Sequence, residues 1–398
     1  MATSRERVLK QLNIKDGHKV ILCLDGGGIR GILTLQLLKL LEETAGLPCY
    51  QFCDMVAGTS TGGIIAALMA SGRTAAQIED LYIKLVKQVF TSRSFAAHQL
   101  ANPPLYTKEK YVKKLKTLVG DMTFKDACTK TGIDLMITSK DVAAGEETFF
   151  SYFVSQPQRS YTYENVLLRA VMEATMSAPT YFHPMERFVD GGVTAYNNPA
   201  MAALIEAVEY GPPQKYKRSN TTVLSFGTGC RPQFIDLKNI ANPKGIDALF
   251  WLNWLLTESG DDASDVQTYL LRSKKIFSGT HFRRFQISLD RGAILKLPNR
   301  KLNRIKGTKA DWLHELTDEE LGGIKLNNVD YFPIMKEIGA AMCEFIQTEA
   351  QERGEQPFAF DLVNKKKRDL LVSREGDIER IMAQMSSPTW IDNSQRDV

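Results

Sequence analysis

The chain contains a serine between two glycines, at a point where a predicted strand gives way to a predicted helix. Gly58, Ser60 and Gly62 have the spacing G-x-S-x-G. Residues 51–56 before them favour a buried strand, and the apolar run 63–70 after them favours a helix. A serine on such a turn exposes its hydroxyl at the top of a sheet, and the glycines avoid clashes with the neighbouring strand and helix. The pattern predicts a nucleophilic serine, with a purely structural turn as the alternative.

A second glycine-rich segment, residues 25–31, follows the apolar strand predicted at 19–24 and leads into leucines at helical spacing over 32–43. It reads D-G-G-G-I-R-G. Consecutive glycines allow backbone N–H groups to converge on one point, and the N-terminus of the following helix adds positive potential. The segment therefore predicts an anion site, which is either an oxyanion hole or the phosphate loop of a nucleotide-binding protein.

The spacing of this segment favours the oxyanion hole. It lacks the G-x-x-x-x-G-K-[S/T] pattern of a phosphate loop. Gly26, Gly28 and Gly31 do match G-x-G-x-x-G, but a dinucleotide site also requires an acidic residue about 20 positions on, at the end of the next strand. Glu42 and Glu43 fall within the predicted helix instead. A nucleophile candidate follows the very next strand, which is where an oxyanion hole is needed.

A third segment supplies a candidate base. Asp190 ends a short strand predicted at 188–190 and precedes Gly191 and Gly192. Taken alone, this composition is typical of a turn. Of the five histidines, only His183 lies in a segment of interest, so a Ser60–His183–Asp190 triad is the alternative to direct contact between serine and aspartate.

Together the three segments resemble the patatin-like phospholipases. That family carries D-G-G-G-x-R-G, G-x-S-x-G and D-G-[G/A] in this order, and the chain has all three at 25–31, 58–62 and 190–192. Residues 177–179 are also similar to the family, and the resemblance covers about 19–229. It implies a three-layer α/β/α fold with a mostly parallel central sheet, and a Ser–Asp dyad that uses no histidine, metal or cofactor.

Carried over by position, the resemblance makes Ser60 the nucleophile and Asp190 its base. An aspartate with its ordinary pKa of about 3.9 is a weak base, so we expect burial to raise the pKa of Asp190. The resemblance implies that the substrate is a membrane phospholipid or another acyl lipid, reached by peripheral membrane contact. It also assigns the oxyanion N–H donors to Gly26, Gly27 and Gly28, with Arg30 supporting the loop.

The composition bounds the remaining functions. The chain of 398 residues has a net charge of +4, which is too small to indicate nucleic-acid binding. Its six cysteines are scattered, which favours reduced thiols over a zinc site or disulfide framework. No secretory signal is evident and no run reaches the roughly 20 apolar residues of a membrane span, so we expect a soluble, cytoplasmic protein.

Strands and helices alternate along the chain, which predicts a parallel sheet covered on both faces. We expect an N-terminal segment (1–18), a catalytic domain (19–350, with its motifs in 19–229) and a C-terminal extension (351–398).

Two local features have two interpretations each. The basic run 365–368 is a solvated face or an anionic-membrane contact, and the aromatic stretch 250–256 is a buried helix or a lipid-contacting lid. Further strands are predicted at 133–139, 222–226 and 285–289, and further helices at 74–90, 164–177, 199–210, 245–256, 264–271 and 329–348.

Two wider hypotheses concern function. A storage or scaffold protein could keep this fold without activity, but an intact dyad argues against it. About 200 residues follow Asp190, more than the sheet requires. A cytosolic enzyme that cleaves membrane lipid must also be restrained from damaging its own cell. We therefore expect low basal activity on bilayers, raised by a small ligand or by assembly into homo-oligomers.

Overall fold

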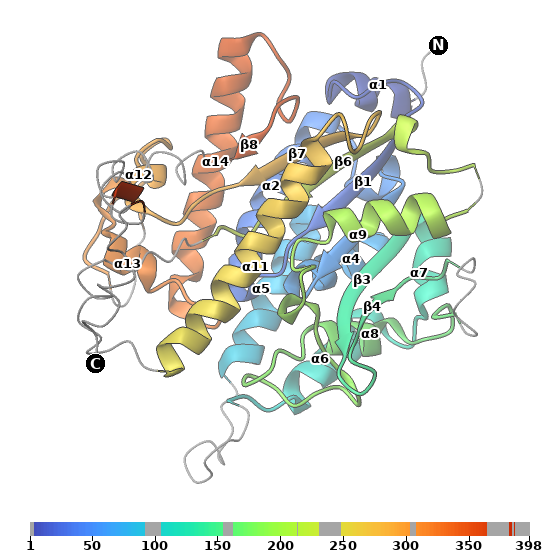
Figure 1. Ribbon diagram of the computed structural model, residues 1–398, viewed down its shortest axis with the longest axis horizontal. Helices are drawn as coiled ribbons and strands as arrows, with labels where there is room; N and C mark the ends of the chain where they lie inside the picture. Colours follow the sequence, from blue (N-terminus) through green and yellow to red (C-terminus); the bar gives the residue numbers. More distant parts are fainter. Residues whose placement is uncertain are drawn as a thin grey trace. The chain divides into compact units, whose positions relative to one another are not determined.

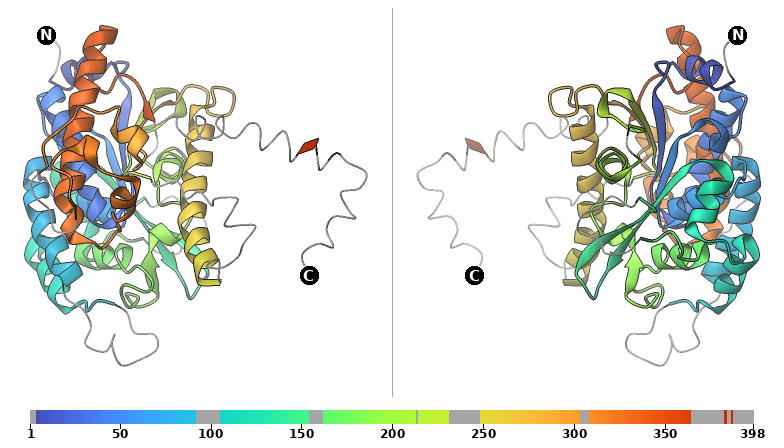
Figure 2. Two further views of the ribbon diagram at one scale, coloured as in Figure 1. Left: turned by 90° about the vertical axis from the view of Figure 1, so that its left-hand side faces the viewer. Right: turned by 90° about the vertical axis from the view of Figure 1, so that its right-hand side faces the viewer.

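The computed structural model describes residues 4–91, 105–153, 162–212, 214–230, 248–302, 308–363, 382–383 and 386, with the backbone alone for 91, 248–258 and 363. A mostly parallel β-sheet lies between two layers of helices (Figures 1 and 2). The strand order is β4-β3-β2-β1-β6-β7-β8, with β5 paired to β3. Residues up to Leu362 form one compact unit. The predicted α/β fold with a mostly parallel central sheet is confirmed.

The parallel part of the sheet consists of five strands, and the strands at its margins are shorter or antiparallel. β4 (Glu146–Phe150) and β5 (Phe188–Asp190) both pair antiparallel with β3, and β8 (Leu362–Val363) ends the sheet on the other side. The five parallel strands are β1 (Lys19–Leu24), β2 (Met55–Thr59), β3 (Asp134–Asp141), β6 (Thr221–Phe226) and β7 (His281–Gln286).

Strand β1 shows why helices cover both faces. Val20, Leu22 and Leu24 belong to a large core with helices α2 (Gly31–Ala45), α4 (Thr61–Ala70), α5 (Ala75–Thr91) and α14 (Phe332–Arg353). Ile21 and Cys23 belong to a smaller core, which includes α9 (Ala200–Ile205). Successive side chains of a strand point to opposite faces, so a strand buried on both faces must be apolar throughout.

Further helices complete the two layers. The long helix α11 (Ala248–Arg272) lies on the same side of the sheet as α9, opposite α2 and α14 (Figure 2). Thr74 and Gln77 form a capping box before α5, with hydrogen bonds of 3.1 and 3.3 Å. The other helices are α1 (Ser4–Gln11), α3 (Cys49–Phe52), α6 (Glu109–Val119), α7 (Phe124–Thr131), α8 (Leu168–Thr175), α12 (Arg291–Ile294) and α13 (Asp318–Gly322).

Several predicted elements differ in extent from the structure. The strand expected at 51–56 begins only at Met55, because Pro48, whose φ suits a helix start, is followed by the short helix α3. The helices expected at 245–256 and 264–271 are one helix, α11, which continues through Gly260 at a cost of about 1 kcal/mol. Strand β7 starts at His281 rather than 285. Its first half was not expected because it contains two charged residues, Arg283 and Arg284, yet both are buried in the sheet.

Two segments that had two interpretations each are not fully described by the structure. The basic run 365–368 and the side chains of 250–256 lie outside the described residues. Within the described part of the chain, no helix combines the length and apolar character needed to cross a bilayer. All six cysteines are described, and none forms a disulfide.

Candidate active site

Ser60 lies on a sharp turn between β2 and α4, as predicted. Its φ of 52° is in the left-handed region, which a serine adopts only where the surroundings enforce it, at a cost of about 1–3 kcal/mol. The glycines on either side permit this turn, because a Cβ at Gly58 would meet the Gly62 carbonyl oxygen at 2.2 Å and one at Gly62 would meet the Leu24 carbonyl oxygen at 2.2 Å. The N–H of Ser60 donates to Thr175 Oγ1 at 2.8 Å. The turn is thus held by the packing of β1, α4 and α8 around it.

The sheet topology brings Asp190 to Ser60 across 130 residues of sequence. Strand β2 pairs with β3 as far as Thr59 opposite Thr138. Strand β5 pairs with the next part of β3, where Asp190 lies opposite Ser139. The ends of β2 and β5 therefore meet against consecutive residues of β3, which places the two predicted site residues side by side.

The two side chains are joined by a hydrogen bond. Ser60 Oγ donates to Asp190 Oδ2 at 2.6 Å, and the N–H of Gly192 donates to Asp190 Oδ1 at 2.7 Å. Asp190 is 5% exposed, and burial raises the pKa of its carboxyl to about 6 against the opposing effect of these two hydrogen bonds. A carboxylate in direct contact with the hydroxyl, and more basic than usual, has the geometry and the pKa of a general base.

The glycine loop packs against this pair. A Cβ at Gly26 would lie 2.4 Å from Asn197 Oδ1 and 3.2 Å from Ser60 Cβ, so a side chain there would displace Asn197 and crowd Ser60. The N–H of Gly26 donates to the Asn197 carbonyl at 3.2 Å, and that of Gly27 donates to Thr61 Oγ1 at 3.2 Å. The N–H of Gly28 has no protein acceptor within the described ranges. Of the three predicted oxyanion donors, Gly28 is thus the one whose N–H is open, and the oxyanion role of all three glycines stays a prediction.

Gly28 is also the point where distant segments hold the loop. It has a φ of +55°, and its carbonyl accepts a hydrogen bond from the hydroxyl of Tyr82. The next residue, Ile29, donates its N–H to the Leu326 carbonyl at 2.8 Å, and the N–H of Arg30 donates to the Gly27 carbonyl at 3.0 Å. The backbone of Arg30 thus closes a turn within the loop, and the supporting role of Arg30 stays a prediction.

His183 is exposed and makes no hydrogen bond to Ser60 or Asp190 in the described part of the structure. Asp190 Oδ2 accepts from the serine hydroxyl and Oδ1 from the N–H of Gly192, and neither partner is a histidine. Nor do the described residues contain a cluster of three or more His, Cys, Asp or Glu side chains that could hold a metal ion.

Comparison with known proteins bears on the same residues. A family model described as patatin-like phospholipase matches residues 22–204. This chain carries a patatin-like phospholipase domain. The resemblance deduced from the three motifs is thereby confirmed, and the domain contains Ser60, Asp190 and the glycine loop.

Relatives of the patatin-like domain include proteins named as phospholipases. The mouse 85/88 kDa calcium-independent phospholipase A2 is 31% identical over 58% of this chain and 30% of its own length. The Escherichia coli cUMP-AMP-activated phospholipase is 32% identical over 54% of this chain and 65% of its own. The solved structure of human GIVD cytosolic phospholipase A2 aligns over 88% of this chain and 62% of its own, with 11% identity and a TM-score of 0.36. The chain thus spans about a third of the mouse relative and just under two thirds of the bacterial one.

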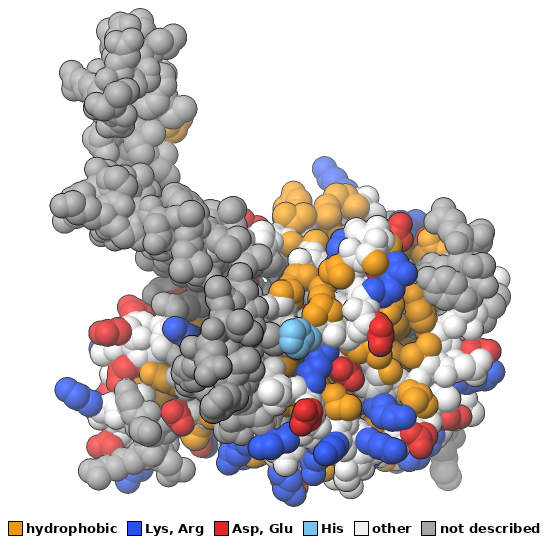
Figure 3. All heavy atoms as spheres, turned by 90° about the horizontal axis from the view of Figure 1, so that it is seen from below, with side chains coloured by type: hydrophobic (Ala, Val, Ile, Leu, Met, Phe, Trp, Pro, Cys, Tyr) orange, Lys and Arg blue, Asp and Glu red, His pale blue; other side chains and the backbone are white. Residues whose placement is uncertain are grey.

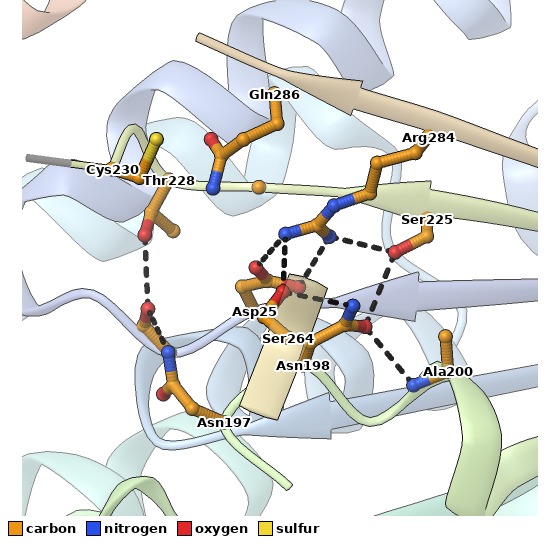
Figure 4. A network of polar contacts seen from close by, with 12 residues as sticks. Asp25, Asn197, Asn198, Ala200, Ser225, Thr228, Cys230, Ser264, Arg284 and Gln286 are labelled. Atoms are coloured by element: carbon orange, nitrogen blue, oxygen red, sulfur yellow. Dashed lines mark hydrogen bonds and ion pairs between the residues drawn. The ribbon is translucent and has the colours of Figure 1, made fainter. Parts of the chain in front are cut away.

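Several residues that hold the site lie outside the matched stretch, and sequence reasoning missed them. Thr228 Oγ1 donates to the Gly26 carbonyl at 2.9 Å, Leu326 binds Ile29, and Arg284 pairs with the carboxylate of Asp25 (Figure 4). The first two gave no signal in the sequence. Arg284 does give a signal, because two arginines next to a predicted buried strand require a buried partner if the strand extends through them.

Proposed function

We propose that this chain is a serine acyl hydrolase of the phospholipase A type, which cleaves carboxylic ester bonds of membrane glycerolipids through Ser60 and Asp190. The observation that carries the proposal is the 2.6 Å hydrogen bond between Ser60 Oγ and a buried aspartate whose pKa is about 6. The family match and the names of the relatives support the lipid substrate.

The proposed reaction has two steps. Ser60 Oγ attacks the ester carbonyl carbon while Asp190 takes the hydroxyl proton, and the developing oxyanion binds the open N–H of Gly28. The tetrahedral intermediate expels the alcohol, which receives the proton from Asp190, and an acyl-serine remains. Asp190 then removes a proton from water as the water attacks the acyl-serine, and it returns this proton to Ser60 Oγ when the fatty acid is released.

A peripheral membrane contact fits the surface near this site. One face of the molecule carries apolar side chains next to lysine and arginine (Figure 3). Exposed apolar residues also occur in the segments that hold the site. Val193 follows the Asp190 motif, Leu326 contacts the glycine loop, and Leu105 binds the Thr180 carbonyl. Apolar and cationic groups together suit an anionic lipid surface.

The alternative of a phosphate loop at residues 26–31 has less support. Two of the three glycine N–H groups already have protein acceptors, which leaves too few donors to hold a phosphate, whereas a single oxyanion can bind the N–H of Gly28. A non-enzymatic storage or scaffold role is also disfavoured, because such a role does not require a strained serine in contact with a buried carboxylate.

The test of the proposed function is the variant Ser60→Ala. We expect it to abolish ester hydrolysis and labelling by a fluorophosphonate probe, since loss of a nucleophile commonly costs about 10⁴–10⁶ in rate. The matched control is Ser71→Ala, a buried serine at the other end of the same helix, whose hydroxyl bonds the Leu68 carbonyl. Labelling that persists in Ser60→Ala, with the modified residue mapped elsewhere, would refute Ser60.

We also propose that activity on bilayers is low until a small ligand or homo-oligomerisation raises it. One relative is named as a cUMP-AMP-activated phospholipase, which supports a nucleotide as the first candidate. Purified protein assayed on a soluble ester and on liposomes, with and without a panel of cyclic nucleotides, tests this. High activity on liposomes that no addition changes would leave activation by the lipid surface alone.

A further inference from the structure

The aspartate that begins the glycine loop is bound by an arginine from the last third of the chain. Asp25 is 3% exposed and Arg284 is 2% exposed. Arg284 Nη1 donates to Asp25 Oδ1 at 2.7 Å, and Nη2 binds the other carboxyl oxygen, so the contact is bidentate. Burial alone would lower the pKa of Arg284, but the nearby Asp25 carboxylate more than offsets this and keeps it above its ordinary value. The pair is therefore a fully desolvated ion pair at the end of β1.

The guanidinium is held in place by further bonds. Its Nη1 donates to Ser225 Oγ at 2.7 Å and its Nη2 to Ser264 Oγ at 3.4 Å. Ser225 lies on β6 and Ser264 on α11, and Asn198 bonds both serines at 3.3 and 3.2 Å. The close-up in Figure 4 shows these side chains converging on Asp25 and Arg284 from β6, α11 and the segment before α9.

The same region fixes the backbone that leads into the glycines. The N–H of Asp25 donates to the Phe226 carbonyl at 3.0 Å, and the next carbonyl, that of Gly26, accepts from Thr228 Oγ1 at 2.9 Å. The side chain of Asp25 and the backbone on both sides of it are thus tied to β6 and β7. Gly28, the open donor, is only three residues further along the chain.

We propose that Arg284 is a positioning residue for the oxyanion loop, a role that rests on the proposed function. It acts through Asp25 in two ways. The bidentate contact fixes the direction in which the loop leaves β1, and a displaced N–H donor at such a site loses much of its value. The positive charge also neutralises a carboxylate that would otherwise oppose the negative charge developing on the substrate oxygen.

The neighbouring residue supplies a matched control. Arg283 is on the same strand and is also buried, but its guanidinium donates to the carbonyls of Leu12, Asn13 and Phe358. It therefore stabilises the N-terminal segment and the loop before β8, and it makes no hydrogen bond to the glycine loop within the described residues. A comparison of variants at the two arginines therefore distinguishes a loss of stability from a loss of loop geometry.

The experiment compares Arg284→Lys with Arg283→Lys on a soluble ester, with kcat expressed per serine labelled by a fluorophosphonate probe at completion. Lysine keeps the charge but cannot make the bidentate contact. We expect Arg284→Lys to lower kcat per labelled site about 10- to 100-fold with KM within about threefold, because the loop acts on the transition state. Arg283→Lys should unfold at lower temperature but keep kcat per labelled site within about twofold of the wild type.

A third variant covers the case in which Arg284→Lys does not fold. Ser225→Ala removes one acceptor of the guanidinium without a change of charge, and we expect a smaller fall in kcat per labelled site, with KM unchanged. Equal kcat per labelled site in the wild type and in whichever of Arg284→Lys and Ser225→Ala is folded would overturn the positioning role. If the wild type itself neither hydrolyses esters nor labels at Ser60, the proposed function fails instead.

Discussion

Two segments of this molecule have the same local sequence and different partners. Asp25-Gly26-Gly27 follows β1 and Asp190-Gly191-Gly192 ends β5, and both carboxyl groups are buried. Asp25 faces the guanidinium of Arg284, whereas Asp190 faces the hydroxyl of Ser60. A carboxylate whose two oxygens bind a cation is a fixed structural charge. One that contacts a hydroxyl and a single backbone N–H can exchange a proton. The partner supplied by the fold, rather than the motif, separates the two roles.

The largest effect should come from Asp190→Asn. The amide cannot accept the proton of Ser60, so we expect kcat to fall by about 10⁴ or more, measured on a soluble ester. His183→Ala is the control near Asp190 in sequence, and because its side chain is exposed it should keep most of the activity. If folded His183→Ala is as inactive as Asp190→Asn, the dyad must be replaced by a triad.

Replacement of the two carboxyl groups, one at a time, should change the free energy of unfolding in opposite directions. Burial raises the pKa of Asp190 to about 6, above the roughly 3.9 of an unfolded chain. As pH rises from 4 to 6, the unfolded state loses this proton before the native state does, so the wild type loses stability, by up to about 3 kcal/mol above pH 6. Asp190→Asn removes this penalty and should raise the free energy of unfolding at pH 7.5, with little change at pH 4.

Asp25→Asn should do the reverse. It leaves the charge of Arg284 buried without its partner, which costs about 3–5 kcal/mol. Urea unfolding of both variants and the wild type at pH 7.5 and pH 4 measures these differences. A stability gain from Asp25→Asn at pH 7.5, or a loss from Asp190→Asn, would contradict the distinction drawn between the two carboxyl groups.

The smallest effect concerns the pH dependence of the reaction. Because Asp190 must be ionised to take the proton of Ser60, we expect kcat/KM to rise with pH and level off above about 6, with a tenfold fall for each unit well below it. Short assays on a soluble ester across pH 4.5–8 measure this, with Ser71→Ala as a folded control. A rise in kcat/KM centred near pH 4 would mean that Asp190 is not buried as it is here.

The sequence predicted the elements that carry the motifs because each is encoded locally. Val20–Leu24 is apolar throughout because β1 is buried on both faces, and Gly58 and Gly62 are required by backbone contacts at 2.2 Å. The juxtaposition of Ser60 with Asp190 was expected from the family resemblance. Its physical cause, the pairing of β2 and β5 with consecutive residues of β3, is a tertiary feature that no local pattern contains.

The residues that sequence analysis missed share a different property. Strand β7 has the sequence HFRRFQ, which does not resemble a buried strand, and the burial of Arg284 is favourable only because it pairs with Asp25. Thr228 and Leu326 act through one hydroxyl and one carbonyl, and such groups occur throughout every chain. Long-range polar contacts of this kind leave no periodicity and no spacing from which they could be predicted.

Helix α11 connects both halves of this arrangement. Ser264 contributes to the binding of Arg284, and one turn further Gln267 donates to the carbonyl of Ala195, close after the Asp190 motif. The opposite side of the helix exposes Val266 and Tyr269, at 58% and 73%. A molecule that binds this outer side and prefers one position of α11 shifts the population of both site segments together. A preference of about 1.4 kcal/mol changes the ratio of the two populations tenfold, although the molecule never enters the active site.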